Sequence, residues 1–289
     1  MPRHIAIILV LSAAFCMSFA ALFVRLIETA DGFQILVYRS VAQGLFVSGI
    51  ALYLERQRLG AFFKNIDRDD VLIAVLMMIA FSTYVLALLN TSVASALFIL
   101  SIAPVFAALL GWLVNGERPS LVAAVCIGLA VLGVGVMIQG GLEGGKTFGN
   151  VLAVLSALAF ATMLVTARKS KKSNVLKGNG MGALLAALVM TPIALTFSDG
   201  GLSIPVIDIW LAMGSGVVTI GLGILFLSLS APHLPAHEVS LLVLLESILS
   251  PIWTSMFLNE KIETAELVGG FLVLLSVIFL TIFGKRLEN

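Results

Sequence analysis

The stretch 236-AHEVSLLVLLESILSPIWTSMFL-258 is long and apolar enough to cross a lipid bilayer, yet it carries Glu246 near its middle. A helix needs about 20 apolar residues to cross about 30 Å of hydrocarbon. An ionised carboxylate at the bilayer centre costs about 3 kcal/mol on insertion scales, so it is tolerated where it faces protein, a partner charge or a wet cavity. In a chain built almost entirely of such stretches, a wet cavity would form a passage for a solute.

The composition places most of the chain in the membrane. Of its 289 residues, 60% are hydrophobic and 11% are charged, whereas an average soluble domain carries about 25% charge. We therefore expect an all-α integral membrane protein with ten transmembrane helices. The expected spans are 5–24, 32–54, 71–90, 93–115, 120–139, 149–167, 180–197, 206–230, 236–258 and 264–283.

The lysine and arginine positions predict the orientation, because basic residues concentrate in cytoplasmic loops. With both termini in the cytoplasm, only Arg25, Lys146 and Lys261 fall outside, and Arg39 lies within a span. The other basic residues fall inside: Arg3, Arg56, Arg58, Lys64, Arg68, Arg118, Arg168, Lys169, Lys171, Lys172, Lys177, Lys285 and Arg286. The basic stretch 167–177 is then expected to meet anionic lipid rather than nucleic acid.

The second half of the chain repeats the first. A shift of 143 residues places Arg25 on Arg168, Glu117 on Glu260 and Ala103 on Glu246. The spans divide into five in residues 1–140 and five in 147–284. Because five is odd, the second repeat must enter the membrane from the opposite side. Inverted repeats of this kind are the architecture of many secondary transporters.

Three short motifs extend this pattern to a known family. They are Tyr38-Arg39 in the second span, Gly-Glu-Arg at 116–118 and Asn-Glu-Lys at 259–261. With them the chain resembles the EamA family of the drug/metabolite transporter superfamily, and within it is most similar to YddG-type exporters of aromatic and other amino acids. The resemblance implies a secondary exporter in the bacterial inner membrane. The family often has Glu-Pro in the ninth helix; here Ser247 follows Glu246, and the proline is Pro251.

Arg39 and Glu246 are the charges expected to contact a substrate. At 1.5 Å per residue they lie roughly 12 Å and 18 Å from the outer ends of their helices, a difference that an arginine side chain can bridge. One interpretation is that they hold the two ends of a zwitterion; a second is that Glu246 takes up a proton in coupled transport. The alternatives are a buried structural pair, or an Arg39 that extends to the outer headgroups.

Aromatic and small polar side chains recur at helical spacing in the same spans, which suits a cavity that is wet but adhesive for apolar or aromatic solutes. Serine and threonine also bond to their own helix routinely, so each position has a structural alternative. The residues expected to line the cavity with Arg39 and Glu246 are Ser12, Phe15, Phe81, Tyr84, Ser95, Phe98, Ser101, Ser156, Phe160, Thr219 and Phe226.

Two further expectations concern helix shape and anchoring. Pro104, Pro192 and Pro251 are expected to interrupt the fourth, seventh and ninth helices, because proline frees a backbone carbonyl and allows a bend. The tryptophans Trp112, Trp210 and Trp253 are expected to anchor span ends at the membrane interface.

The sequence carries no pattern typical of an enzyme. His237-Glu238 lacks the second histidine of a zinc HExxH motif, and no nucleophile elbow or P-loop is present. We therefore expect no cofactor or metal, and a small metabolite as substrate, with an amino acid as the first expectation. A proton and membrane lipids are the other expected partners. The alternatives are a flippase for lipids or polyprenyl-linked molecules on the same fold, or an exporter of another small metabolite.

Overall fold

The computed structural model describes residues 1–55, 66–115, 121–143, 145–169, 176–230, 233–234 and 236–283, and this part of the chain is helical without strands. The first repeat contains α1 (Arg3–Ser18), α2 (Ala20–Arg25), α3 (Gly32–Glu55), α5 (Arg68–Asn90), α6 (Val93–Leu100), α7 (Ala103–Asn115) and α8 (Leu121–Glu143). The second contains α9 (Thr147–Lys169), α10 (Leu176–Phe197), α11 (Val206–Gly214), the π-helix η1 (Ser215–Gly221), α12 (Leu222–Ser230), α13 (Ala236–Leu258) and α14 (Thr264–Phe283).

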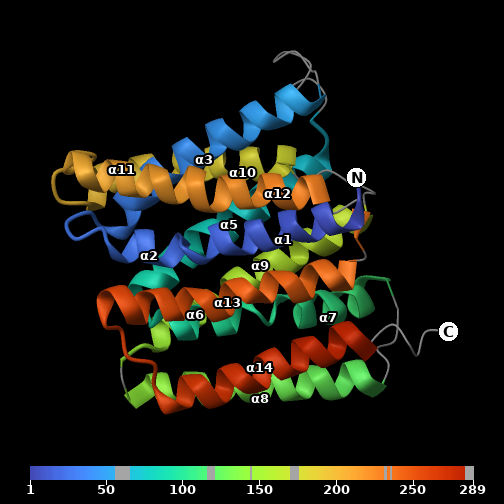
Figure 1. The fold of residues 1–289 in the computed structure, drawn as a ribbon. Coiled ribbons are helices and arrows are strands. Elements are labelled where there is room, and N and C mark those ends of the chain that lie inside the picture. Colours follow the sequence, from blue (N-terminus) through green and yellow to red (C-terminus); the bar gives the residue numbers. More distant parts are fainter. Residues whose placement is uncertain are drawn as a thin grey trace.

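The helices lie side by side with their long axes roughly aligned, so the bundle has two ends (Figure 1). One end, at the left of Figure 1, holds the connections 26–31, 91–92, 198–205 and 259–263; we call it the network end. The other, the terminal end, holds the start of α1 and the close of α14. Helix α3 packs on α10, α5 on α9 and α8 on α14, each pair joining one repeat to the other.

Seven of the ten expected spans are long and apolar enough to cross a membrane, judged on the described residues. They are Arg3–Arg25, Gly32–Leu54, Arg68–Asn90, Val93–Leu113, Thr147–Ala167, Leu176–Phe197 and Val206–Ser230. The expected spans 120–139, 236–258 and 264–283 contain shorter apolar helices, Ala124–Met137, Leu242–Leu258 and Thr264–Phe279. The all-helical membrane fold is confirmed, and the ten-span topology stays a prediction.

Three of the spans are discontinuous, at positions that the prolines predict only in part. The first breaks at Phe19, the fourth at Ser101 and Ile102, and the eighth runs through η1. Pro104 lies in the first turn of α7, where its missing N–H costs no helical bond. The expected breaks at Pro192 and Pro251 are wrong, since α10 and α13 continue through them.

Close approach of helix backbones depends on glycines between the repeats. A side-chain carbon at Gly269 in α14 would lie 2.5 Å from the carbonyl oxygen of Gly133 in α8 and 2.3 Å from Met137. A side-chain carbon at Gly216 in η1 would lie 2.3 Å from the carbonyl oxygen of Arg39. Small residues at such contacts are typical of membrane helix interfaces.

We expect Gly269→Ala to lower the thermal midpoint of the detergent-solubilised protein. The added methyl group has no room without a backbone shift, and overpacking of this kind costs about 1–3 kcal/mol. Gly128→Ala in α8 is the control, because a side-chain carbon there meets no atom within 4 Å and alanine favours the helix. Equal midpoints for both variants would contradict the close contact.

Candidate functional site

Arg39 is a buried cation in the middle of the bundle. It lies on α3 where η1 packs against that helix, and only 1% of the residue is exposed. Its guanidinium carbon lies 5.5 Å from the centre of the Tyr84 ring on α5, a cation–π geometry. The aromatic face supplies part of the stabilisation that water would otherwise give.

Glu246 on α13 is a second buried ionisable residue. Within the described residues no ion pair or hydrogen bond joins it to Arg39, so the direct pair anticipated as one alternative is not formed in this conformation. The two side chains come from different repeats, and neither neutralises the other by direct contact.

The buried face of α13 is polar along much of its length. The hydroxyl of Ser247 lies 2.7 Å from that of Ser101, at the break between α6 and α7. Two turns after Glu246, the Trp253 indole donates a 2.9 Å hydrogen bond to Ser18 at the break after α1. This bond ties α13 to the first repeat. The interfacial role of Trp253 stays a prediction, and no sequence pattern signalled its bond to Ser18.

An aromatic stack accompanies Trp253 between α1 and α13. The Phe19 ring lies parallel to the indole with centroids 5.1 Å apart. The Phe15 ring packs edge-on against both, at 5.2 Å from Phe19 and 6.3 Å from Trp253. Phe15 is itself exposed at the surface of the bundle. Phe19 and Trp253 provide an aromatic surface. Of the three stacked residues, the set expected to line the cavity contains Phe15.

The structure spreads the remaining predicted residues over several environments. Phe81 lies in the core with Met77 and Met163, and Phe98 packs against Gly270 of α14. The hydroxyls of Ser156 and Thr219 are buried and donate to backbone carbonyls, of Ala80 and Ser215. Ser12 and Phe226 are half-buried and Phe160 is exposed. Arg39 and Tyr84 lie together in the buried interior, and Ser101 contacts Ser247, the residue after Glu246.

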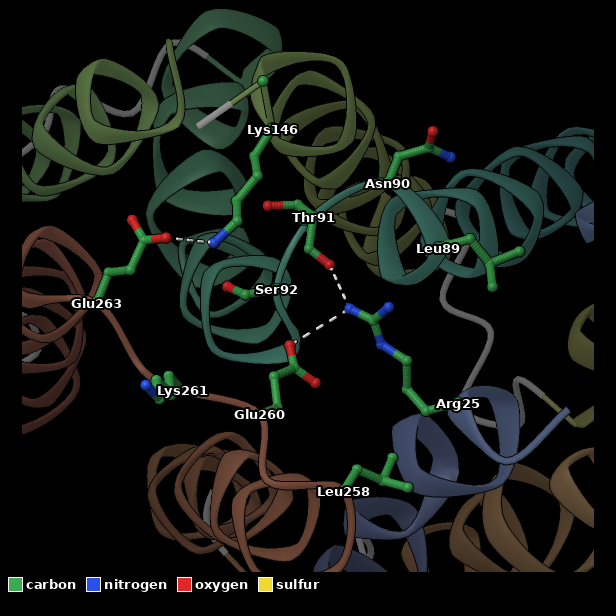
Figure 2. A pocket seen from close by; sticks show the side chains of 11 residues that line it. Arg25, Leu89, Asn90, Thr91, Ser92, Lys146, Leu258, Glu260, Lys261 and Glu263 are labelled. Atoms are coloured by element: carbon green, nitrogen blue, oxygen red, sulfur yellow. Dashed lines mark hydrogen bonds and ion pairs between the residues drawn. The ribbon is translucent and has the colours of Figure 1, made fainter. Parts of the chain in front are cut away.

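A second polar region lies at the network end and was missed by sequence reasoning (Figure 2). Arg25 donates to the Thr91 carbonyl at 2.7 Å and lies 3.3 Å from Glu260. The same Glu260 oxygen accepts from the Val93 N–H at 2.8 Å. Asn259, in the left-handed conformation with φ 54°, ends α13 and turns the chain so that Glu260 meets the first repeat. The sequence signal that could have indicated this region was the match of Arg25 to Arg168 and of Glu260 to Glu117 between the repeats. Glu117 itself lies outside the described residues.

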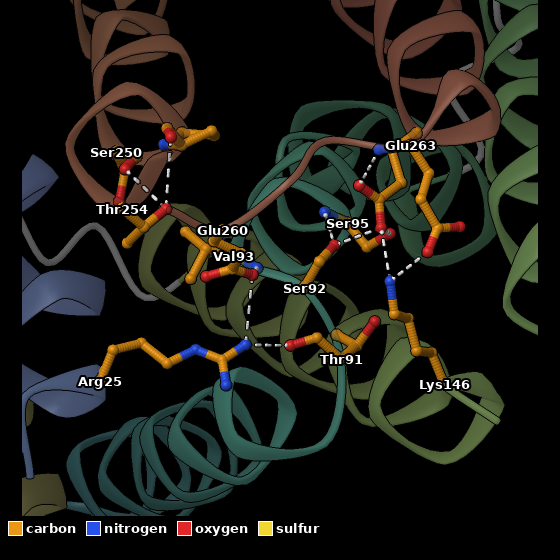
Figure 3. A network of polar contacts seen from close by, with 12 residues as sticks. Arg25, Thr91, Ser92, Val93, Ser95, Lys146, Ser250, Thr254, Glu260 and Glu263 are labelled. Atoms are coloured by element: carbon orange, nitrogen blue, oxygen red, sulfur yellow. Dashed lines mark hydrogen bonds and ion pairs between the residues drawn. The ribbon is translucent and has the colours of Figure 1, made fainter. Parts of the chain in front are cut away.

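Glu266 is the most buried acid among the described residues of this region. Figure 3 labels its partners Ser92, Ser95, Lys146 and Glu263. It accepts from the hydroxyls of Ser92 and Ser95, and its second oxygen accepts from the Glu263 N–H at 2.9 Å. Lys146, between the repeats, lies 2.6 Å from Glu263 and 3.4 Å from Glu266. Ser95, predicted to line a cavity, serves here as a donor to Glu266.

The electrostatics of Lys146 follow from these contacts. Partial burial lowers its pKa, but the hydrogen bond to Glu263 and the charges of Glu266 and Glu263 outweigh that effect and raise the pKa overall. Lys146 therefore stays charged at neutral pH. We call Arg25, Lys146, Glu260, Glu263 and Glu266, with their partners in 91–95, the end network.

A hollow of about 750 Å³ opens beside the end network. Its lining residues are Arg25, Leu89, Asn90, Thr91, Ser92, Gly145, Lys146, Leu258, Glu260, Lys261 and Glu263. None of the central residues Arg39, Tyr84 or Glu246 lines it, so the hollow and the central charges are separate features. Among the described residues, no group of three or more metal-binding side chains is assembled.

Apolar helices that enclose separated opposite charges define a multi-pass membrane protein with a polar interior. The chain belongs to the EamA-like transporter family, whose model matches twice, at residues 4–139 and 147–282. This confirms the predicted family and the two copies of its domain. An uncharacterized transporter of Archaeoglobus fulgidus is 26% identical over 218 residues, 73% of this chain and 76% of that protein. A protein of known crystal structure has the same fold, with a TM-score of 0.66 and 19% identity over 99% of this chain and 100% of that one.

We expect Glu266→Gln to destabilise the purified protein more than Glu263→Gln. Only 3% of Glu266 is exposed, and the neutral amide leaves Lys146 without its buried partner, for which a loss of about 2–3 kcal/mol is expected. The Glu263 side chain is 46% exposed, and exposed ion pairs contribute little. Thermal midpoints in detergent measure the difference, and a larger loss for Glu263→Gln would contradict the assignment of Glu266 as the centre of the network.

Proposed function

We propose that this EamA-family transporter is a secondary exporter of small metabolites, with amino acids carrying aromatic or other apolar side chains as its substrates. The observation that carries the proposal is the pair of buried, unneutralised charges, Arg39 from the first repeat and Glu246 from the second. A zwitterion presents the complementary charges. Buried charges inside a membrane bundle are costly, and they mark substrate or ion pathways in membrane proteins.

Helix packing supports the inverted arrangement of the two repeats. If each helix is replaced by the corresponding helix of the other repeat, the contact of α5 with α9 becomes that of α12 with α1, which is also present. In the same way, the contact of α1 with α13 corresponds to the contacts of α9 with α6 and α7. The helices α3 and α10 correspond to each other in the two repeats, as do α8 and α14. Exchanging the repeats therefore leaves these two contacts unchanged. A two-fold axis in the membrane plane would produce this pattern, and it would allow the two repeats to rock about a central site.

The basic residues support an orientation with both termini in the cytoplasm of a bacterial inner membrane. At the terminal end lie the start of α1 at Arg3, the start of α5 at Arg68 and the end of α9 at Lys169. The network end holds Arg25, Lys146 and Lys261 (Figure 2). By the bias of lysine and arginine toward the cytoplasm, the network end faces outward.

In this mechanism the end network is the outer gate. Glu260 of the second repeat binds Arg25 and the Val93 N–H of the first. Glu266 accepts hydrogen bonds from Ser92 and Ser95 of the first repeat. Lys146, between the repeats, contacts Glu263 and Glu266. These contacts hold the repeats together at the outer end, while Arg39 is enclosed. Opening outward breaks the contacts across the repeats and exposes the central charges.

We expect cysteine labelling to establish the orientation. In a variant without Cys16 and Cys126, a membrane-impermeant thiol reagent should label Asn90→Cys in intact spheroplasts, because Asn90 is exposed at the network end. Arg68→Cys, at the exposed start of α5, should react only after permeabilisation. Labelling of both from the same side would overturn the topology.

We expect Glu246→Gln to reduce counterflow of labelled L-phenylalanine in proteoliposomes by at least tenfold, because the carboxylate that holds the ammonium group is lost. Glu28→Gln, an exposed acid outside both polar regions, is the control and should retain wild-type flux. If Glu246 instead couples a proton, the variant keeps flux but loses its pH dependence. Wild-type transport of a labelled lipid without any amino acid flux would favour the flippase.

A further inference from the structure

We propose that Arg39, Gln43 and Tyr84 form a carboxylate-binding subsite, and that the transported molecules therefore carry a free carboxylate. This inference rests on the proposed transport function and assigns one part of its central site. Gln43 was not among the residues that the sequence indicated. We call the three side chains the donor cluster.

The donor cluster is buried and its hydrogen-bonding capacity is unused. Arg39 and Gln43 each expose 1% of their surface, and Tyr84 is also buried. The Nε and Nη2 atoms of Arg39, the Nε2 of Gln43 and the Oη of Tyr84 are buried and have no hydrogen-bond partner among the residues that the structure describes. Buried polar groups in folded proteins are nearly always paired, so a group of four such atoms indicates a ligand site.

The open positions on Arg39 lie along one edge of its guanidinium group, because the Nε and Nη2 hydrogens point in the same direction. That edge matches the two oxygens of a carboxylate in a bidentate pair, the strongest geometry available to arginine. The donor cluster offers several N–H and O–H donors, and a carboxylate has acceptors only, with about four lone-pair sites. An uncharged amide has one acceptor oxygen and would bring further donors to a site already rich in them.

The backbone that carries Arg39 and Gln43 is held in place. The two residues are one turn apart on α3 and therefore share a face. A side-chain carbon at Gly216 of η1 would lie 2.3 Å from the Arg39 carbonyl oxygen and 3.2 Å from the Gln43 nitrogen, so the π-helix backbone lies directly against this turn. Tyr84 is fixed on α5 beneath the guanidinium. Fixed donors bind a ligand without the cost of ordering them.

Glu246 does not fill this site from within the protein. It forms no described hydrogen bond to the donor cluster, whose buried donors have no partner among the described residues. Its carboxylate is therefore left for a cationic group of the ligand, and the donor cluster for the anionic one. This division assigns the two ends of a zwitterion to different repeats, so that a bound substrate would contact both.

The first test uses ligands on the wild-type protein, so that it does not depend on a variant folding. We expect 3-phenylpropionate to raise the thermal midpoint of the detergent-solubilised protein and 3-phenylpropionamide, of nearly equal size, to leave it unchanged. In L-phenylalanine counterflow, the free acid should compete at least tenfold better than the amide. Equal effects of acid and amide in both measurements would overturn the subsite, because a cluster that only orders water treats them alike.

The second test removes donors one at a time. We expect Tyr84→Phe and Gln43→Leu each to lower the apparent affinity for 3-phenylpropionate about tenfold and to leave that for 3-phenylpropionamide unchanged. A tenfold loss is the size expected for one hydrogen bond to a charged group. Ser82→Ala is the matched control, because Ser82 is also a buried, unpaired hydroxyl on α5. The ratio of its apparent affinities for the acid and the amide should equal that of the wild type. Equal loss for Ser82→Ala would show that the effect is structural.

The outcomes separate the subsite from the transport function. Acid-specific stabilisation without L-phenylalanine flux would contradict the proposed substrates and support the subsite. If L-phenylalanine is transported and 3-phenylpropionate and 3-phenylpropionamide compete equally with it, the result would support the transport function and contradict the subsite.

Discussion

The cost of holding a charge away from water organises this molecule. In hydrocarbon a charge must be paired, solvated or given a ligand, and the structure meets this demand differently in two places. At the network end, Glu266 is surrounded by two hydroxyls, a backbone N–H and Lys146, so its charge is satisfied within the protein. In the centre, Arg39 lies over the Tyr84 ring, and two of its nitrogens have no hydrogen-bond partner in the described part of the chain. A satisfied network holds an element in place, whereas an unsatisfied one is ready to receive a ligand.

Irregular helix geometry appears where these polar groups lie. The break after α1 contributes Ser18 to Trp253, the break between α6 and α7 contributes Ser101 to Ser247, and η1 brings its backbone against Arg39. π-helical turns frequently occur at functional sites, and discontinuous membrane helices recur around transporter binding sites. The three irregularities therefore converge on the same interior region from different directions, and they position its polar groups.

The sequence was informative about properties that can be read along the chain without knowing which distant segments meet. Apolar run length predicted the helices, and the repeat of Arg25 and Glu260 at a fixed offset predicted two related halves. Burial cost alone identified Arg39 and Glu246. The sequence was uninformative where contacts join distant segments. Nothing local signals the bond of Trp253 to Ser18, and Ser95 resembled a cavity residue because its partner is Glu266, far along the chain. Gln43 was overlooked because a lone glutamine in an apolar helix has no pattern.

The unequal exposure of the ion pairs in the end network gives the network end a graded response to dissolved salt. Arg25 and Glu260 are each partly exposed, so mobile ions in the surrounding medium weaken their attraction. The contact between Lys146 and Glu266 is screened less, because only 3% of the Glu266 side chain is exposed. In a more saline medium the first contact loosens more than the second. The ionic strength at this end would then adjust how readily this face of the molecule separates.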